Sequence, residues 1–170
     1  GSSLLTVFIL QTVTGTLLAM TYVPSPSGAY ESIRYITDVQ TFGWLIRGMH
    51  KWGASVMVIL LFLHMGRTFF YGAYKYPREM TWLTGSLIFI SVMGMGLTGY
   101  LLVWDERAYW ASVVAINING TAPVLGPFIS KFLLGGPVIG AQTISRFYAL
   151  HMLLIPGAII ALIFVHMWLV

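Results

Sequence analysis

Four apolar segments, each long enough to cross a lipid bilayer, constrain this chain more than any other feature of its sequence. Charged residues make up only 8% of the chain, against 58% hydrophobic residues. A transmembrane helix needs about 20 mostly apolar residues, and such a segment must be helical because lipid offers the backbone no hydrogen bonds. The sequence therefore predicts an all-α membrane protein, a single four-helix bundle over residues 1–170. Its spans are expected at about 3–23, 42–74, 81–104 and 142–170.

The basic residues of the connecting loops predict the orientation of these spans. The connection between spans two and three holds Arg67, Lys75 and Arg78, whereas the first loop holds Arg34 as its only cation. Because Lys and Arg collect in loops that stay on the inner side, this second turn is expected on the cytoplasmic, stromal or matrix side. The first and third loops then lie on the outer side.

The third loop, residues 105–141, is unusually long for a compact bundle, and loops of that length are usually functional. Its first part, 105–116, is predicted to be an interfacial helix. The stretch 119–140 is punctuated by Gly and Pro and is expected to be irregular. A shorter amphipathic helical turn is expected around 31–41, and Pro156 is expected to kink the fourth span.

Four histidines lie in or beside the second and fourth apolar segments. His50 and His64 are related as i and i+14, and His151 and His166 as i and i+15. These spacings correspond to roughly 21 and 22 Å along a helix and return each pair to within about 40° and 60° of one face. A hydrocarbon core is about 30 Å thick. Each helix therefore places one histidine near each membrane surface, on the same side of the helix.

Topology pairs the histidines across the bundle. Spans two and four are separated by two crossings and run parallel, which places His50 beside His151 toward the outer side and His64 beside His166 toward the inner side. Ionisable groups within a membrane are costly and usually functional. The simplest chemistry for two matched pairs is two haems, each held between spans two and four. Two axial histidines leave iron no open position, which favours electron transfer over oxygen binding.

Glycines in the other two spans repeat the i, i+14 spacing of the first histidine pair. They are Gly1 with Gly15 in the first span and Gly85 with Gly99 in the third. Glycine at these positions would leave room for the face of a porphyrin. The alternative is that small residues are common wherever transmembrane helices touch. The match to the histidines favours the haem interpretation.

Arginines flank the histidines at similar depths. Arg47, Arg146 and Arg67 each lie within five residues of one of them. Guanidinium groups at these depths would pair with anionic haem propionates. The alternative is that they extend to the interface as isolated charged side chains. Three arginines at matching depths favour the haem interpretation.

Five stretches of the sequence are long and specific. They read FGWLIRGMH (42–50), KYPREMTW (75–82), TGYLLVWD (98–105), YWA (109–111) and SRFYALH (145–151). They resemble the cytochrome b family of quinol–cytochrome c or plastocyanin oxidoreductases over the whole chain. The spacing of His151 and His166 is similar to that of the short split form, called b6-type, in which a separate subunit carries the remaining helices.

This resemblance implies roles for individual residues. His50 and His151 would ligate an outer b-type haem, and His64 and His166 an inner one. The four glycines would leave room for the haem rings. Arg47 and Arg146 would face the outer haem, and Arg67 would face the inner one. Part of an outer quinol pocket would be formed by Trp104, Asp105, Tyr109 and Ala111. The chain departs from the family pattern at Val103, Glu106 and Ala108, all in this pocket region.

The resemblance also implies an activity shared among subunits, with no catalytic residue in this chain alone. Quinol would be oxidised at the outer side, with one electron passing to a Rieske-type iron–sulfur protein and on to a c-type cytochrome. The other would cross through both haems to a quinone, coupling oxidation to proton translocation. The expected setting is a dimeric complex among the lipids of a bacterial plasma or thylakoid membrane, without nucleic acid. In the split form a cysteine just before the position of Gly1 can carry an extra covalent haem.

Two other interpretations of the histidines remain open at the level of sequence. The first is a four-helix di-haem anchor of another respiratory enzyme, such as nitrate reductase or formate dehydrogenase, which places its histidines differently. The second is a transporter without haem in which the histidines relay protons.

Overall fold

The computed structural model describes residues 1–170, and every regular element is helical. Four long helical segments are each long and apolar enough to cross a membrane. They are α1 (Ser2–Ala19), α3 (Gly43–Phe70), α4 (Glu79–Leu101) and a continuous segment of α7 (Ala141–Ala149), the π-turn η1 (Leu150–Leu154) and α8 (Ile155–Leu169). The predicted all-α architecture with four spans is confirmed.

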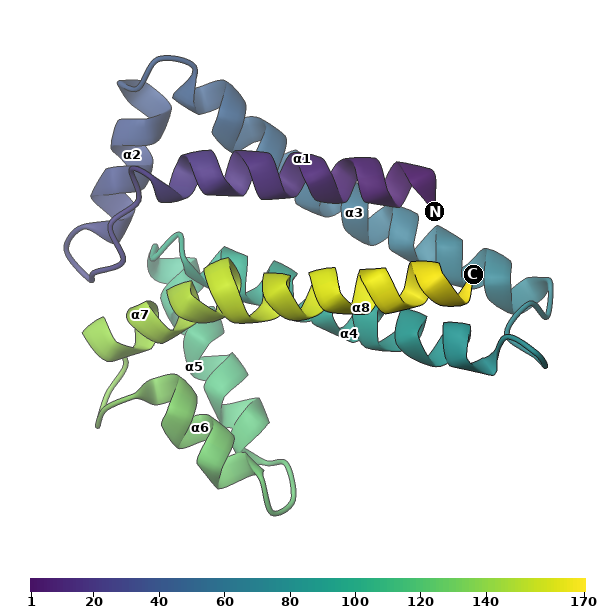
Figure 1. Ribbon diagram of the computed structural model, residues 1–170. Coiled ribbons are helices and arrows are strands. Elements are labelled where there is room, and N and C mark those ends of the chain that lie inside the picture. Colours follow the sequence, from purple (N-terminus) through teal and green to yellow (C-terminus); the bar gives the residue numbers. More distant parts are fainter.

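The four long helices run roughly along one direction, as Figure 1 shows, and form two pairs. Helix α1 packs on α3, and α4 packs on α8. Large apolar side chains point outward from them, for example Leu153, exposed by 70%, and Phe164, exposed by 77%. Outward apolar surface of this kind suits helices surrounded by lipid, where the backbone bonds internally and the side chains face hydrocarbon.

The connections divide between the two ends of the bundle. At one end, here named the turn end, residues 71–78 join α3 to α4, and both chain termini lie close to this end in Figure 1. The other end, here named the loop end, carries three shorter helices: α2 (Ala29–Asp38), α5 (Glu106–Gly120) and α6 (Gly126–Leu134). Helix α5 is the predicted interfacial helix, and the Asp105 carboxylate caps it by accepting the Ala108 N–H at 2.8 Å.

Helix α6 is missed by the sequence analysis, which expects the stretch 119–140 to be irregular. Pro127 lies in the first turn of α6, where the missing N–H of proline does no harm. Gly135 ends the helix with a left-handed φ of 75°. The Pro and Gly residues that suggest a loop are therefore the start and stop of a short helix.

Two apolar clusters hold the bundle together. The larger one lies at the loop end and comprises Ala29, Leu101, Leu102, Ile116, Leu133, Ile144 and Phe147. The smaller one lies in the middle of the bundle, between α3, α4 and α8, and comprises Met57, Leu61, Ile88, Val92 and Ile159. The first fixes the short helices onto the spans, and the second, here named the central cluster, fixes the spans to one another.

A hydrogen bond to the end of α4 anchors the turn after α1. The Tyr22 hydroxyl donates to the Leu102 carbonyl oxygen at 2.7 Å, and its ring stacks on that of Tyr148 with centroids 5.5 Å apart. Burial raises the pKa of the Tyr22 phenol, and Tyr148 raises it further. The phenol therefore stays a hydrogen-bond donor throughout the neutral pH range.

Tyr22→Phe is expected to destabilise the protein by about 1 kcal/mol, because the buried carbonyl loses its partner. The measurement is the midpoint of thermal unfolding in detergent, with Tyr35→Phe, whose side chain is 51% exposed, as the control. Because the folded phenol titrates above the unfolded one, the difference between Tyr22→Phe and the parent should be full below pH about 10 and decline above it. Equal midpoints for the Tyr22 variant and the parent would contradict this role.

Candidate functional site

His50 on α3 and His151 on the α7–α8 segment come together toward the loop end. Their ring centroids are 6.3 Å apart, and the ring planes are inclined at 78°. Two imidazole–metal bonds of about 2.0 Å each, added to the inner radii of the two rings, account for about 6 Å. The separation of the two rings therefore matches a pair of axial ligands on either side of one metal atom.

His64 and His166 lie on the same two helical segments, nearer the turn end. His166 is in the last turn of α8, and His64 lies near the C-terminal end of α3. Arg67 follows His64 in the last turn of α3. The structure thus brings His50 and His151 together, as topology predicts from the sequence, and places His64 and His166 nearer the turn end of the same two helical segments.

Three of the four histidines make a hydrogen bond through Nδ1 to a threonine of a neighbouring helix. The Nδ1···Oγ1 distances are 2.9 Å for His50 and Thr14, 3.1 Å for His151 and Thr98, and 3.1 Å for His166 and Thr84. The threonines lie on α1 and α4, which pack on the helices that carry the histidines. The sequence analysis does not single out these threonines.

The threonine hydroxyls determine which nitrogen of each ring carries the proton. Each hydroxyl has one hydrogen, and a carbonyl oxygen of the preceding turn accepts it, at 2.7 Å for Leu10, 3.0 Å for Met80 and 2.8 Å for Gly94. Toward the imidazole the hydroxyl oxygen can therefore only accept, so Nδ1–H donates. The lone pair of Nε2 is left free, which is the state that a metal ligand requires.

A signal for these threonines is present in the sequence. Each one directly precedes a glycine of the repeated spacing, giving Thr-Gly pairs at 14–15, 84–85 and 98–99. A hydroxyl followed by a residue without a side chain allows the imidazole to approach the neighbouring helix closely and to bond to it at the same time.

Three of the four predicted glycines lie directly against a histidine ring. A Cβ atom added to each would meet the ring Cε1 atom at 2.5 Å for Gly99 and His151, 3.0 Å for Gly15 and His50, and 3.2 Å for Gly85 and His166. A Cβ atom at Gly1 would meet nothing within 4 Å. The space that the sequence analysis assigns to a porphyrin face is thus, at three positions, also the space that admits the imidazole.

Two of the predicted arginines donate hydrogen bonds to other parts of the chain at the loop end. Arg47 donates from Nη1 to the Thr37 hydroxyl of α2 at 3.1 Å. Arg146 donates to the carbonyl oxygens of Lys131 and Phe132 in the last turn of α6, and its guanidinium lies 5.2 Å from the centre of the Phe132 ring. These contacts hold both guanidinium groups at the loop end of the bundle.

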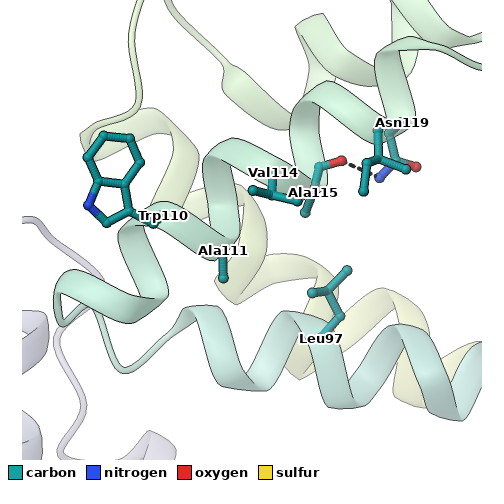
Figure 2. A pocket seen from close by; sticks show the side chains of 7 residues that line it. Leu97, Trp110, Ala111, Val114, Ala115 and Asn119 are labelled. Atoms are coloured by element: carbon teal, nitrogen blue, oxygen red, sulfur yellow. Dashed lines mark hydrogen bonds between the residues drawn. The ribbon is translucent and has the colours of Figure 1, made fainter.

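An apolar groove of about 470 Å³ lies between α4 and α5 (Figure 2). It is lined by Leu97, Trp110, Ala111, Val114, Ala115, Ile118 and Asn119. The Asn119 side chain donates to the Ala115 carbonyl oxygen at 2.8 Å, so its amide is already bonded within the helix. The groove therefore suits an apolar molecule.

Of the four residues that the sequence analysis assigns to a quinol pocket, only Ala111 lines this groove. Trp104 and Asp105 form the turn between α4 and α5, where Trp104 takes a left-handed φ of 56° and Asp105 caps α5. The Tyr109 ring packs edge-on against Trp110, with centroids 5.4 Å apart. Of the other groove residues, Leu97 lies on α4 and the rest lie on α5. Those on α5 are missed because this helix carries no strong amphipathic pattern.

No three His, Asp or Glu side chains gather anywhere in the chain. A structural zinc site takes four protein ligands, so this chain builds no such site. Two imidazoles can complete the coordination of an iron whose other ligands come from a porphyrin. The paired imidazoles, with Nε2 free in the three rings that bond a threonine, fit a haem.

Comparisons with known proteins agree with one another over the whole chain. The family model described as Cytochrome b/b6/petB matches residues 1–170. The menaquinol:cytochrome c reductase cytochrome b subunit of Geobacillus thermodenitrificans is 46% identical over 161 residues, which are 94% of this chain and 72% of that protein. Cytochrome b6 of Heliobacterium modesticaldum is 40% identical over 166 residues, 98% of this chain and 78% of that protein.

A solved structure titled "Hyperthermophilic respiratory Complex III" has the same fold. It superposes with a TM-score of 0.89 at 33% identity and covers 98% of this chain. The chain spans 45% of the length of that solved protein.

Proposed function

This chain belongs to the cytochrome b/b6/petB family, and on that premise we propose that it carries electrons across a membrane through two b-type haems in a quinol–cytochrome c or plastocyanin oxidoreductase. Membership of the family implies b-type haem binding. The number of haems and their ligands are part of the proposal: His50 with His151, and His64 with His166.

The observation that carries the proposal is the facing pair of imidazoles 6.3 Å apart, with Nδ1 of each bonded to a threonine. Haem iron, when bound, supplies the ability to take up and release one electron at a time. The two imidazoles would hold the haem between the helices and would leave its iron no site for oxygen. The threonines keep both rings turned inward, and the glycines let the rings sit against α1 and α4.

The side of the membrane on which each pair lies also belongs to the proposal. The turn end carries Arg67, Lys75 and Arg78 and would face the inner side, so the His64–His166 pair would be the inner one. The loop end, with α2, α5 and α6, would face the outer side. There Arg47 and Arg146 would offer guanidinium groups to haem propionates, and Arg67 would do so at the inner side.

Quinol would be oxidised at the loop end, in a pocket that this chain builds only in part. The groove between α4 and α5 offers an apolar wall, and the neighbouring Trp104–Asp105 turn and Tyr109 would complete this side of the pocket. A subunit with the remaining helices would close it. A Rieske-type iron–sulfur protein and a c-type cytochrome would take the other electron, in a dimeric complex that releases protons outside and takes them up inside.

The proposal is tested by a reduced-minus-oxidised absorption spectrum of the purified complex, with a pyridine haemochrome determination of haem per chain. We expect two low-spin b-type haems that do not react with carbon monoxide. A fully assembled complex without haem absorption would overturn the proposal and would favour a proton path through the histidines.

The threonines give a further expected result. Thr98→Val keeps the shape of the side chain but leaves Nδ1–H of His151 without its acceptor. This should weaken haem binding at that pair by roughly 10- to 100-fold, the range found for such second partners of metal ligands. The midpoint potential of that haem should rise, because an imidazole that no longer donates is a poorer donor to ferric iron.

The check is a redox titration that resolves the two haems. Thr98→Ser restores the hydroxyl and should restore the potential, which a merely structural role of the residue would not require. Equal potentials in the Val and Ser variants would contradict the assignment.

A further inference from the structure

The two helical segments that carry the histidines differ in spacing by one residue. His50 and His64 are related as i and i+14 on α3, which is a regular α-helix throughout. His151 and His166 are related as i and i+15 on the α7–α8 segment. In a regular α-helix the extra residue would add about 1.5 Å of length and about 100° of rotation. Two pairs that face each other at two levels cannot both form with such a difference.

The threonines of α4 show this difference in spacing directly. Thr84 and Thr98 have the i, i+14 spacing on another regular helix, and each bonds a histidine of the neighbouring segment at the same distance of 3.1 Å. Histidines with the longer spacing thus meet threonines with the shorter one. One residue between His151 and His166 must therefore contribute neither rise along the helix axis nor rotation about it.

The π-turn η1 accommodates this extra residue. The Ile155 N–H bonds to the Leu150 carbonyl oxygen, five residues back, so the turn contains one residue more than an α-turn. This is the only π-turn of the chain, and it begins one residue before His151. When that residue is left out of the count, the two histidines have the same i, i+14 spacing as their partners on the other helices.

Pro156 explains why the wide turn forms at this point. Proline has no N–H to continue the α pattern, and in a regular helix its ring would press on the carbonyl of Met152, four residues back. A widened turn just before Pro156 relieves that contact, and α8 then continues without interruption. The kink expected at Pro156 stays a prediction, and a π-turn lies directly before that residue.

We propose that the π-turn at Leu150–Leu154 is a register-correcting element that sets His151 and His166 at the same rise and rotation as His50 and His64. This inference rests on the proposed function, because the matched levels matter only if each pair shares one haem. It predicts that one residue of the π-turn is dispensable, whereas no residue between His50 and His64 is.

The test removes one lipid-facing residue from each segment in the full complex. Leu153 is 70% exposed and lies in η1, and Ile59 is 59% exposed and lies between the histidines of α3. Deletion of Leu153 together with Pro156→Ala should leave a regular helix with the i, i+14 spacing and retain both haems. Deletion of Ile59 shortens a helix that has no wide turn to relax, and haem per chain should fall by half or more.

Because the deletion moves Pro156 one position closer to His151, it is made both alone and together with Pro156→Ala. The readouts are haem per chain, the two midpoint potentials, and the amount of assembled complex in the membrane. The proposal is overturned if the Leu153 deletion loses a haem or fails to accumulate in both backgrounds, or if the Ile59 deletion keeps both haems. A parent complex that contains no haem would instead overturn the proposed function.

Discussion

Replacing His64 by alanine is expected to remove one haem from the assembled complex and leave the other in place. His64 and His166 are the proposed ligands nearer the turn end. A haem held by one imidazole in place of two would lose its fixed position between the helices. The His50–His151 pair lies at the other end of the same helices and keeps its threonine partners at 2.9 and 3.1 Å. Haem per chain should therefore fall from two to one, and a redox titration should lose one of its two components.

Leu63→Ala is the control, because Leu63 is the neighbouring residue on α3 and its side chain is 65% exposed toward lipid. This control should keep both haems. Retention of both haems in the His64 variant would show that the ligands are assigned to the wrong residues. Loss of both haems would show that the two haem sites do not form independently.

Gly99→Ala is expected to have the second large effect. Its new Cβ would lie 2.5 Å from Cε1 of His151, a distance at which the imidazole or one of the two helices must shift. Overpacking of this kind costs about 1–3 kcal/mol, which corresponds to a loss of haem affinity at that pair of roughly 5- to 150-fold. The measurement is the haem content of the complex after dilution into haem-free detergent.

The same helix offers a matched control. A Cβ added to Gly96 meets nothing within 4 Å, so Gly96→Ala should leave haem binding unchanged. Gly15→Ala and Gly85→Ala, with contacts at 3.0 and 3.2 Å, should have smaller effects than Gly99→Ala. If all four variants retain haem equally well, the glycines do not serve to admit the rings.

The spans and the histidine pairs follow from the sequence because two simple properties determine them. Apolar length locates a membrane helix, and the helical period fixes which side chains share a face. Counting crossings then aligns His50 with His151. These arguments need no tertiary contacts, which is why they succeed here.

The threonines, the Arg146 contacts and the π-turn are missed because they depend on contacts between distant parts of the chain. Thr14 and Thr98 matter because of rings that lie 36 and 53 residues further along the chain. Arg146 holds the end of α6 through carbonyl oxygens of Lys131 and Phe132, on a different helix. The π-turn is needed only because α3 and α4 impose the shorter spacing on the histidines. A single-sequence argument about local periodicity does not contain this information.

The central cluster has a consequence for how charge crosses the protein. Met57 lies midway between His50 and His64, and Val92 lies midway between Gly85 and Gly99, so the cluster fills the layer between the two histidine levels. An electron tunnels through saturated hydrocarbon, whereas a proton needs an unbroken chain of hydrogen-bonding groups. Side chains such as Ile159, only 1% exposed, offer no such chain. In the proposed orientation, an electron that passed through this layer from the outer to the inner side would move net charge against the membrane voltage, at about 2.3 kcal/mol per 100 mV for a full crossing.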